Sequence, residues 1–279
     1  MPTGSEVFAR TVRALQPYAS EVVFIGGWVH ALYLAEVNAG EQAIRTEDID
    51  LTIPHRLLAA GRPALLNLVS SAGYEIQEVL GGNGTVEIFQ PGPGQSVIEL
   101  DILTESANPK DDIAIEGQAN LKVQGYPGQH VLLDNARWME VGAEIHEMLD
   151  PPARIRVPTL SAYLLAKGLS SRTRTRLPKQ AKDLVYLVEI VRHPALGRTA
   201  VEGMGEMASR YPEEYARWRG YLTETLTNAS LLSEIAEQLI LGHRSMGERG
   251  AVVKTIVARL RRLLGETPDP DRSHIATVR

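Results

Sequence analysis

Apolar positions along the first 150 residues form short runs separated by turn residues. The clearest run covers 48–53, where Asp, Ile, Asp, Leu, Thr and Ile alternate with the period of two that is typical of a half-buried strand. Similar patterns predict strands over 21–25, 74–80, 85–89 and 96–103, and one or two more between 121 and 133. Glycine- and proline-rich turns at 81–84 and 91–94 indicate hairpins. Helical spacing predicts helices over 7–15, 28–37 and 57–72, the last with its main body from Pro63.

Beyond Asp150 the pattern changes to longer segments with helical spacing. Pro151-Pro152 is the expected linker, and Thr159 is a candidate N-cap for a helix that runs to Gly168. Further helices are expected over 178–192, 196–210, 212–226, 231–241 and 247–264, before a proline-containing tail. The sequence therefore predicts an α+β protein, with a mixed β-sheet domain over 1–150 and an α-helical domain over 151–279.

Composition narrows the functional classes. The chain has 279 residues, 44% hydrophobic and 23% charged, as in an ordinary globular protein. Its net charge of -5 excludes a bulk basic surface for nucleic acid but permits a local one. The absence of cysteine excludes disulfides, zinc–thiolate sites and cysteine nucleophiles. No apolar run is long enough to span a bilayer and Met1–Gln16 does not have a signal-peptide pattern, so we expect a soluble, cytoplasmic protein.

The strongest candidate chemistry lies at the ends of two predicted strands. Gly26-Gly27 ends the strand over 21–25, where backbone N–H groups and a helix N-terminus can approach a triphosphate. Asp48 and Asp50, two positions apart, point to the same side of their strand. Two adjacent carboxylates repel each other unless a cation lies between them, and Mg²⁺ accepts carboxylate and phosphate oxygens. A solvated strand edge is the other interpretation of this pair.

A third acid would complete a two-metal site. The strand over 96–103 carries Glu99 and Asp101 on one face. Asp101 has the tighter apolar flanks, and the choice between the two acids stays open at this point. With three acids, one metal ion activates an acceptor oxygen and the other stabilises the leaving pyrophosphate.

These residues resemble the nucleotidyltransferase superfamily, with its Gly-Gly turn, its hydrophobic–Asp–hydrophobic–Asp strand and its third acid on a later strand. Within it, Thr46 to Leu51 with Arg45 just before is most similar to the AbiEii/MenT-like branch of toxin–antitoxin and abortive-infection systems. The usual Ser after the first glycine is absent, so contacts to the triphosphate at Gly26-Gly27 must use the backbone. The resemblance implies Mg²⁺, or Mn²⁺ in its place, bound by Asp48, Asp50 and Asp101.

A second match to this branch lies in the helical part. Leu164-Leu165-Ala166-Lys167, then Arg172, then Lys182-Asp183-Leu184 is similar to the branch's Lys, Arg and Lys/Arg-Asp-Leu pattern. The resemblance implies that Lys167 contacts the triphosphate and that Asp183 is a further active-site acid. It also implies that ATP or another NTP is bound with help from Gly26, Gly27, Thr46 and Arg172.

The segment from Lys167 to Lys182 carries six positive residues and no acid. On an acidic chain this is a strong local concentration of charge, suited to a triphosphate or an RNA backbone. A solvated loop is the alternative interpretation of such a charge run.

The sequence thus favours an enzyme that transfers NMP from an NTP to an acceptor hydroxyl. The resemblance implies an RNA acceptor such as a tRNA 3′ end, a toxin role and a cognate antitoxin protein as a partner. A small-molecule (antibiotic) or protein nucleotidyltransferase stays open, as does a non-catalytic nucleotide-binding regulator.

Overall fold

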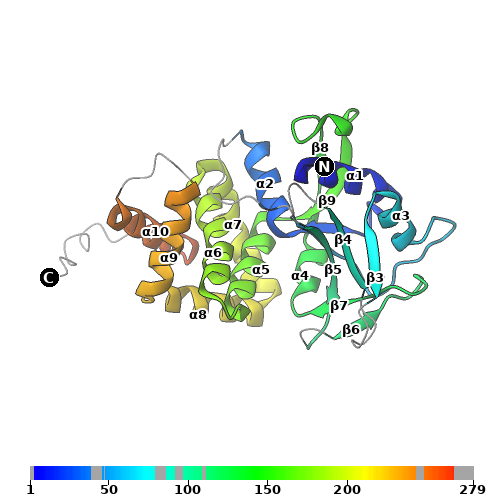
Figure 1. Ribbon diagram of the computed structural model, residues 1–279. Helices are drawn as coiled ribbons and strands as arrows, with labels where there is room; N and C mark the ends of the chain where they lie inside the picture. Colours follow the sequence, from blue (N-terminus) through cyan, green and yellow to red (C-terminus); the bar gives the residue numbers. More distant parts are fainter. Residues whose placement is uncertain are drawn as a thin grey trace. The chain divides into compact units, whose positions relative to one another are not determined.

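The structure is a computed structural model that describes residues 3–38, 46, 48–78, 86–91, 97–108, 111–242 and 248–266. These residues form two compact units, the first ending at Ala166 and the second beginning at Lys167. The first unit holds the sheet and the second is helical (Figure 1). The fold class is therefore α+β with a C-terminal helical region, as the sequence predicts.

A mixed sheet of nine strands, counted over the described residues, forms the centre of the first unit. Seven strands follow the order β3-β4-β5-β2-β1-β9-β8, while β7 pairs with β5 and β6 pairs with β7. The strands are β1 (Val23–Ile25), β2 (Ile49–Thr52), β3 (Glu75–Glu78), β4 (Val86–Pro91), β5 (Val97–Glu105), β6 (Asp112–Ala114), β7 (Lys122–Tyr126), β8 (Ala136–Val141) and β9 (Ala153–Pro158). Both β2–β5 and β1–β9 pair in parallel, whereas β1–β2 and β8–β9 are antiparallel.

Four α-helices and two 3-10 turns, counted over the same residues, belong to this unit. They are α1 (Gly4–Ala14), η1 (Gln16–Tyr18), α2 (Gly26–Glu36), α3 (Leu65–Ser71), α4 (Gln129–Asp134) and η2 (Glu147–Leu149). The ring of Phe8 in α1 stacks on Trp28 in α2 with centroids 4.3 Å apart, and Phe24 of β1 meets the Phe8 ring edge-on. All three side chains are buried, so this aromatic cluster joins both helices to the sheet.

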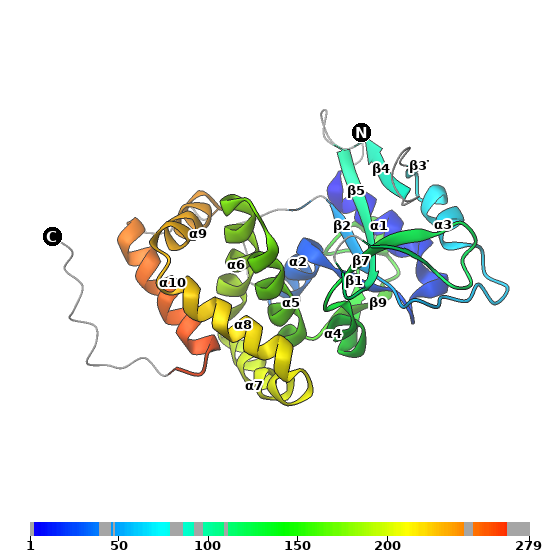
Figure 2. The same ribbon diagram turned by 90° about the horizontal axis from the view of Figure 1, so that it is seen from below.

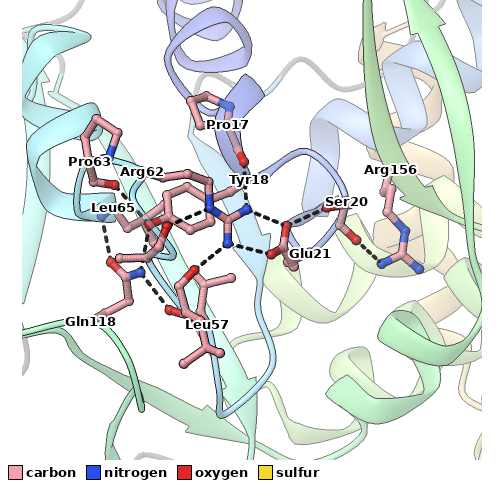
Figure 3. Close-up of polar contacts among 12 residues, drawn as sticks. Pro17, Tyr18, Ser20, Glu21, Leu57, Arg62, Pro63, Leu65, Gln118 and Arg156 are labelled. Carbon is pink, nitrogen blue, oxygen red and sulfur yellow. Dashed lines mark hydrogen bonds and ion pairs between the residues drawn. The ribbon is translucent and has the colours of Figure 1, made fainter.

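A buried polar network fixes the long connection between β2 and α3 (Figure 3). The Gln118 side chain accepts from Leu65 N at 2.7 Å and donates to Leu57 O at 2.7 Å and to the Tyr18 hydroxyl at 2.9 Å. The Tyr18 hydroxyl donates in turn to Pro63 O at 3.0 Å. Every polar atom of this buried amide is thus satisfied, which removes the cost of burying it.

Arg62 is the second part of this network. Its guanidinium donates twice to the Glu21 carboxylate, at 2.8 and 3.1 Å, and lies 4.0 Å from the centre of the Tyr18 ring. It also donates to the carbonyls of Pro17, Leu58 and Ala59. One side chain therefore holds η1, Glu21 and the β2–α3 connection together.

The expected linker at Pro151-Pro152 is wrong. Val141 pairs with Ala153 in the antiparallel ladder of β8 and β9, so the two prolines lie in the loop that joins neighbouring strands. The boundary between the units falls instead inside the following helix, between Ala166 and Lys167, and not at Asp150. The sequence pattern does not predict β6, β8 and β9 as strands, and α4 occupies part of a stretch that it predicts as strand.

The helical region consists of α5 (Leu160–Thr173), α6 (Leu177–Arg192), α7 (Pro194–Arg210), α8 (Pro212–Thr225), α9 (Ala229–Gly242) and α10 (Arg249–Leu263). Its central helix is α6, which packs against α7, α9 and α10 (Figure 2). The residues Asp183–Val191 are buried without interruption, so α6 is enclosed on all sides, as expected of a helix in the middle of a core. No helix in the described ranges is long and apolar enough to cross a membrane. The expected turn at 81–84 and residues 92–94 of the second turn lie outside the described residues, as does the tail from 267 onward.

Replacing Arg62 with Ala is expected to lower the free energy of unfolding by about 2 kcal/mol, because two charge-assisted hydrogen bonds and a cation–π contact disappear. The hydrogen bonds from Arg62 lower the pKa of Glu21 below its usual value. The pair therefore stabilises the fold above the unfolded pKa of about 4.3 and loses that stabilisation as the pH falls through the folded pKa. Urea unfolding at pH 7 and pH 3 measures both effects.

Arg217 offers the matched control, because its pair with Glu214 is at the surface, with 56% of the Arg217 side chain exposed. Its replacement with Ala should cost less than about 1 kcal/mol at pH 7. Equal losses of stability for the two variants would contradict the role assigned to Arg62.

Candidate active site

The turn from β1 into α2 depends on a glycine at position 26. Gly26 has a φ of +73°, a conformation that residues with a Cβ rarely adopt. A Cβ built on Gly26 would also overlap the carboxylate of Asp50, whose backbone is the register partner of Ile25. The Asp50 side chain therefore lies directly against the Gly26 backbone, at the first residue of α2. The structure thus brings the glycine turn and Asp50 together.

Asp101 lies beside Asp50 because β2 and β5 pair in parallel. Asp50 and Asp101 are register partners, so their side chains leave the sheet on the same face of neighbouring strands. The residues that alternate with them, Ile49, Leu100 and Ile102, are buried on the opposite face. Asp101 is exposed and Asp50 is half-buried.

Two more acids, Asp48 and Glu99, lie near the start of β2 and in β5. Asp48 is exposed, and its carboxylate accepts from the backbone N–H of Glu99 at a long 3.5 Å. Glu99 is exposed as well and alternates with the buried residues of β5. Thr46 is half-buried just before β2, and Gly27 is buried in the first turn of α2.

The carboxylate oxygens of these acids are the kind of ligand that Mg²⁺ and Mn²⁺ prefer. Carboxylate oxygens on adjacent strands repel one another, and a hard divalent cation removes that repulsion while it accepts oxygen ligands. Within the described ranges, no three His, Asp or Glu side chains are close enough together, as they stand, to hold a metal ion. Asp50 and Asp101 accordingly share one face of two paired strands, and Asp48 lies one residue before β2, without the three closing around one point.

In the second unit, the buried carboxylate of Asp183 accepts hydrogen bonds from residues of α5 and of the turn that follows it. Asp183 is 3% exposed. Its oxygens accept from Lys167 Nζ at 3.1 Å, Ser170 Oγ at 3.2 Å and Arg174 Nε at 3.3 Å. Lys167 Nζ also lies 4.9 Å from the centre of the Tyr186 ring. The two residues that the helical motif singles out, Lys167 and Asp183, therefore form an ion pair.

Sequence reasoning does not find the other two partners of Asp183. The sequence marks Arg174 only as one charge of the basic segment and assigns Ser170 no role. The spacing from Ser170 to Asp183 does not indicate contact by itself, because the turn between α5 and α6 sets which residues face each other. The signal that could have found them is a buried Asp in an apolar helix, since such a charge requires partners.

Three cations of the basic segment remain at the surface. Arg172, Arg176 and Lys179 are exposed, and none of them pairs with an acid in the part of the chain that the structure describes. The segment is held by Ser171, whose hydroxyl donates to Gln180 O at 2.9 Å and lies 2.7 Å from the Tyr221 hydroxyl. The α5–α6 turn thus presents positive charge from a fixed backbone.

Comparisons with known proteins identify the family. A family model described as Nucleotidyltransferase matches residues 5–196. Among solved structures, an H. pylori protein described as a candidate nucleotidyltransferase aligns at 13% identity over 94% of both chains, with a TM-score of 0.47. An antigenic nucleotidyltransferase-like protein from Paracoccidioides brasiliensis aligns at 14% identity over 78% of this chain and 94% of its own, with a TM-score of 0.37. No curated protein matches the sequence.

Replacing Gly26 with Ala is expected to destabilise the fold by more than about 3 kcal/mol, because the new methyl group adds a clash with the Asp50 carboxylate to the strain of a positive φ. The measurement is urea unfolding, with nucleotide binding measured in parallel.

Gly128→Ala separates the two causes. Gly128 has a φ of +88° but nothing within 4 Å of an added Cβ, so only backbone strain of about 1–2 kcal/mol is expected there. Equal destabilisation of the two variants would show that contact with Asp50 does not constrain position 26.

Proposed function

Because the chain belongs to the nucleotidyltransferase family, we propose that this enzyme uses Asp48, Asp50 and Asp101 to transfer NMP from an NTP to an acceptor hydroxyl. The observation that carries the proposal is the in-register pairing of Asp50 with Asp101 beside the Gly26 turn. Such a pair of carboxylates at a helix N-terminus suits a nucleotide bound together with a divalent cation.

In this reaction the acceptor oxygen forms a bond to the α-phosphorus, the bond from that phosphorus to the β-phosphate bridge breaks, and pyrophosphate leaves. Asp48, Asp50 and Asp101 would hold Mg²⁺, or Mn²⁺ in its place, which would neutralise charge on the phosphates and lower the pKa of the acceptor hydroxyl. Asp101, the more exposed member of the in-register pair, accepts the proton of the acceptor hydroxyl. The backbone N–H groups of Gly26 and Gly27 orient the triphosphate, with Thr46 beside them.

We also propose roles for Lys167, Arg172 and Asp183 of the second unit. Lys167 neutralises charge on the triphosphate, and Arg172 adds a second phosphate contact. Asp183 orients the Lys167 ammonium through their 3.1 Å ion pair and also holds Arg174. Support for these roles comes from the helical motif and from the ion pair that joins its two residues.

We further propose that the acceptor is RNA, such as a tRNA 3′ end, and that the enzyme is a toxin of the AbiEii/MenT-like kind with a cognate antitoxin. The similarity of the motifs at 46–51 and 164–184 to that branch supports this assignment. The exposed cations Arg172, Arg176 and Lys179 support an extended polyanion as the acceptor, because a small acceptor needs no such surface.

The test offers each α-³²P-labelled NTP with Mg²⁺ to total RNA, purified tRNA, a protein extract and an aminoglycoside panel. Wild-type enzyme is expected to label tRNA. Asp50→Asn and Asp101→Asn should each lower the rate at least about 100-fold, because each removes a charged group that acts on the reacting phosphate. Glu99→Gln is the matched control on the same face of β5 and should retain most of the activity.

The other outcomes are informative. If Glu99→Gln abolishes labelling while Asp101→Asn does not, Glu99 is the third acid. Labelling of an aminoglycoside or of protein but never of RNA would overturn the toxin assignment and keep the reaction. If wild type and Asp50→Asn both label nothing in any pool, the proposed reaction is wrong.

The basic segment makes a separate prediction. The triple variant Arg172→Gln, Arg176→Gln and Lys179→Gln should weaken tRNA binding and flatten its salt dependence by about 0.7 in slope for each phosphate that is no longer neutralised. The triple variant Arg198→Gln, Arg219→Gln and Arg262→Gln removes equal charge from exposed positions elsewhere in the same unit. Equal salt slopes for the two variants would show that the α5–α6 turn does not contact RNA.

A further inference from the structure

A cavity of about 200 Å³ lies among the helices of the second unit, and its lining residues all follow the α5–α6 turn in the sequence. Its lining comes from α6, α9 and α10, which pack against one another (Figure 2). Two arginines line it, Arg192 at the end of α6 and Arg259 in the last turns of α10. The rest of the lining is Leu239, Ala251, Val252, Thr255 and Ile256.

Arg259 has a hydrogen-bond donor without an acceptor among the described residues. Its Nη1 atom is buried and donates no hydrogen bond within the described part of the chain. A buried guanidinium N–H without an acceptor is costly, so the structure leaves a donor ready for a ligand. Arg192 is exposed at the mouth of the same cavity, and no ion pair with a described acid involves it.

The charges around the cavity do not cancel. Burial, and after it the positive charge of Arg192, lower the pKa of Arg259 to about 10, and the Glu189 carboxylate only partly offsets them. Arg259 stays protonated at neutral pH, so two cations face one small space. An anion placed there would relieve both their repulsion and the desolvation of Arg259.

We propose that this cavity binds a small organic phosphate monoester. The two guanidiniums come from different helices, and a phosphate has enough oxygens to accept from both, whereas a carboxylate matches one fork. The apolar side chains Leu239, Val252 and Ile256 provide a wall for the organic part. Most of this lining comes from residues beyond position 196, where the family match ends, and Arg192 lies just inside that match.

The test is a ligand-detected NMR titration of the full chain, without divalent cations, with phenyl phosphate, inorganic phosphate and benzoate as probes. Phenyl phosphate should bind more tightly than inorganic phosphate, because it also buries apolar surface, and more tightly than benzoate. Arg192→Gln and Arg259→Lys should each weaken phenyl phosphate binding by about tenfold or more, because each removes charge-assisted hydrogen bonds. Arg262→Gln, exposed on α10 and outside the cavity, is the matched control and should bind as wild type does.

Binding at the proposed active site is excluded by repeating the titration on Arg172→Gln, which removes a proposed phosphate contact there and should bind phenyl phosphate as wild type does. Thermal unfolding of each variant confirms that it is folded before it is titrated, and Arg192→Gln keeps the test decisive if Arg259→Lys does not fold. Unchanged binding in Arg192→Gln, equal weakening in Arg262→Gln, or tighter binding of benzoate than of phenyl phosphate would overturn the proposal. Loss of binding only in Arg172→Gln would assign the phosphate to the proposed active site instead.

Discussion

The close approach of the Asp50 carboxylate to the Gly26 backbone is the constraint on which the first unit's site depends. It requires a residue without a Cβ at the start of α2, it sets where β1 must end, and it places one acid at a helix N-terminus. The parallel pairing of β2 with β5 then adds Asp101 at the same level of the sheet. Because the buried faces of both strands are apolar, the register cannot slip by one residue without turning the acids into the core.

Asp183 has the corresponding role in the helical unit. A carboxylate that is 3% exposed must be paired, and its three donors come from α5 and from the turn that follows it. Lys167 and Arg174 pair with Asp183, whereas Arg172, Arg176 and Lys179 are exposed to solvent. Pairing with Asp183 therefore divides the basic segment into cations that stabilise the turn and cations that can contact a polyanion. Its total charge alone, read from the sequence, does not show this division.

Much of the site's framework was predictable, because it rests on local patterns. Alternation over 48–53 predicted β2, and the confirmed α+β class follows from the change to helical spacing in the second half. The pair β8–β9 was missed, although Ala153, Ile155 and Val157 alternate with arginines, because Pro151-Pro152 is as typical of a turn as of a linker. The neighbours of Asp183 depend on how two helices meet, which no spacing along one chain defines.

Asp183 and Arg259 of the helical unit differ in a way that separates structural stabilisation from ligand binding. Asp183 has three donors within 3.3 Å, so its partners are internal and nothing further is needed to stabilise it. Arg259 has a buried N–H group that donates to no described residue, a second arginine near it and a cavity in front of it. Folding tolerates such an arrangement only at a cost, because burial and like charge both disfavour the protonated guanidinium. An anion that enters from solvent removes both penalties at once, and the apolar wall beside the arginines favours an anion with an organic part.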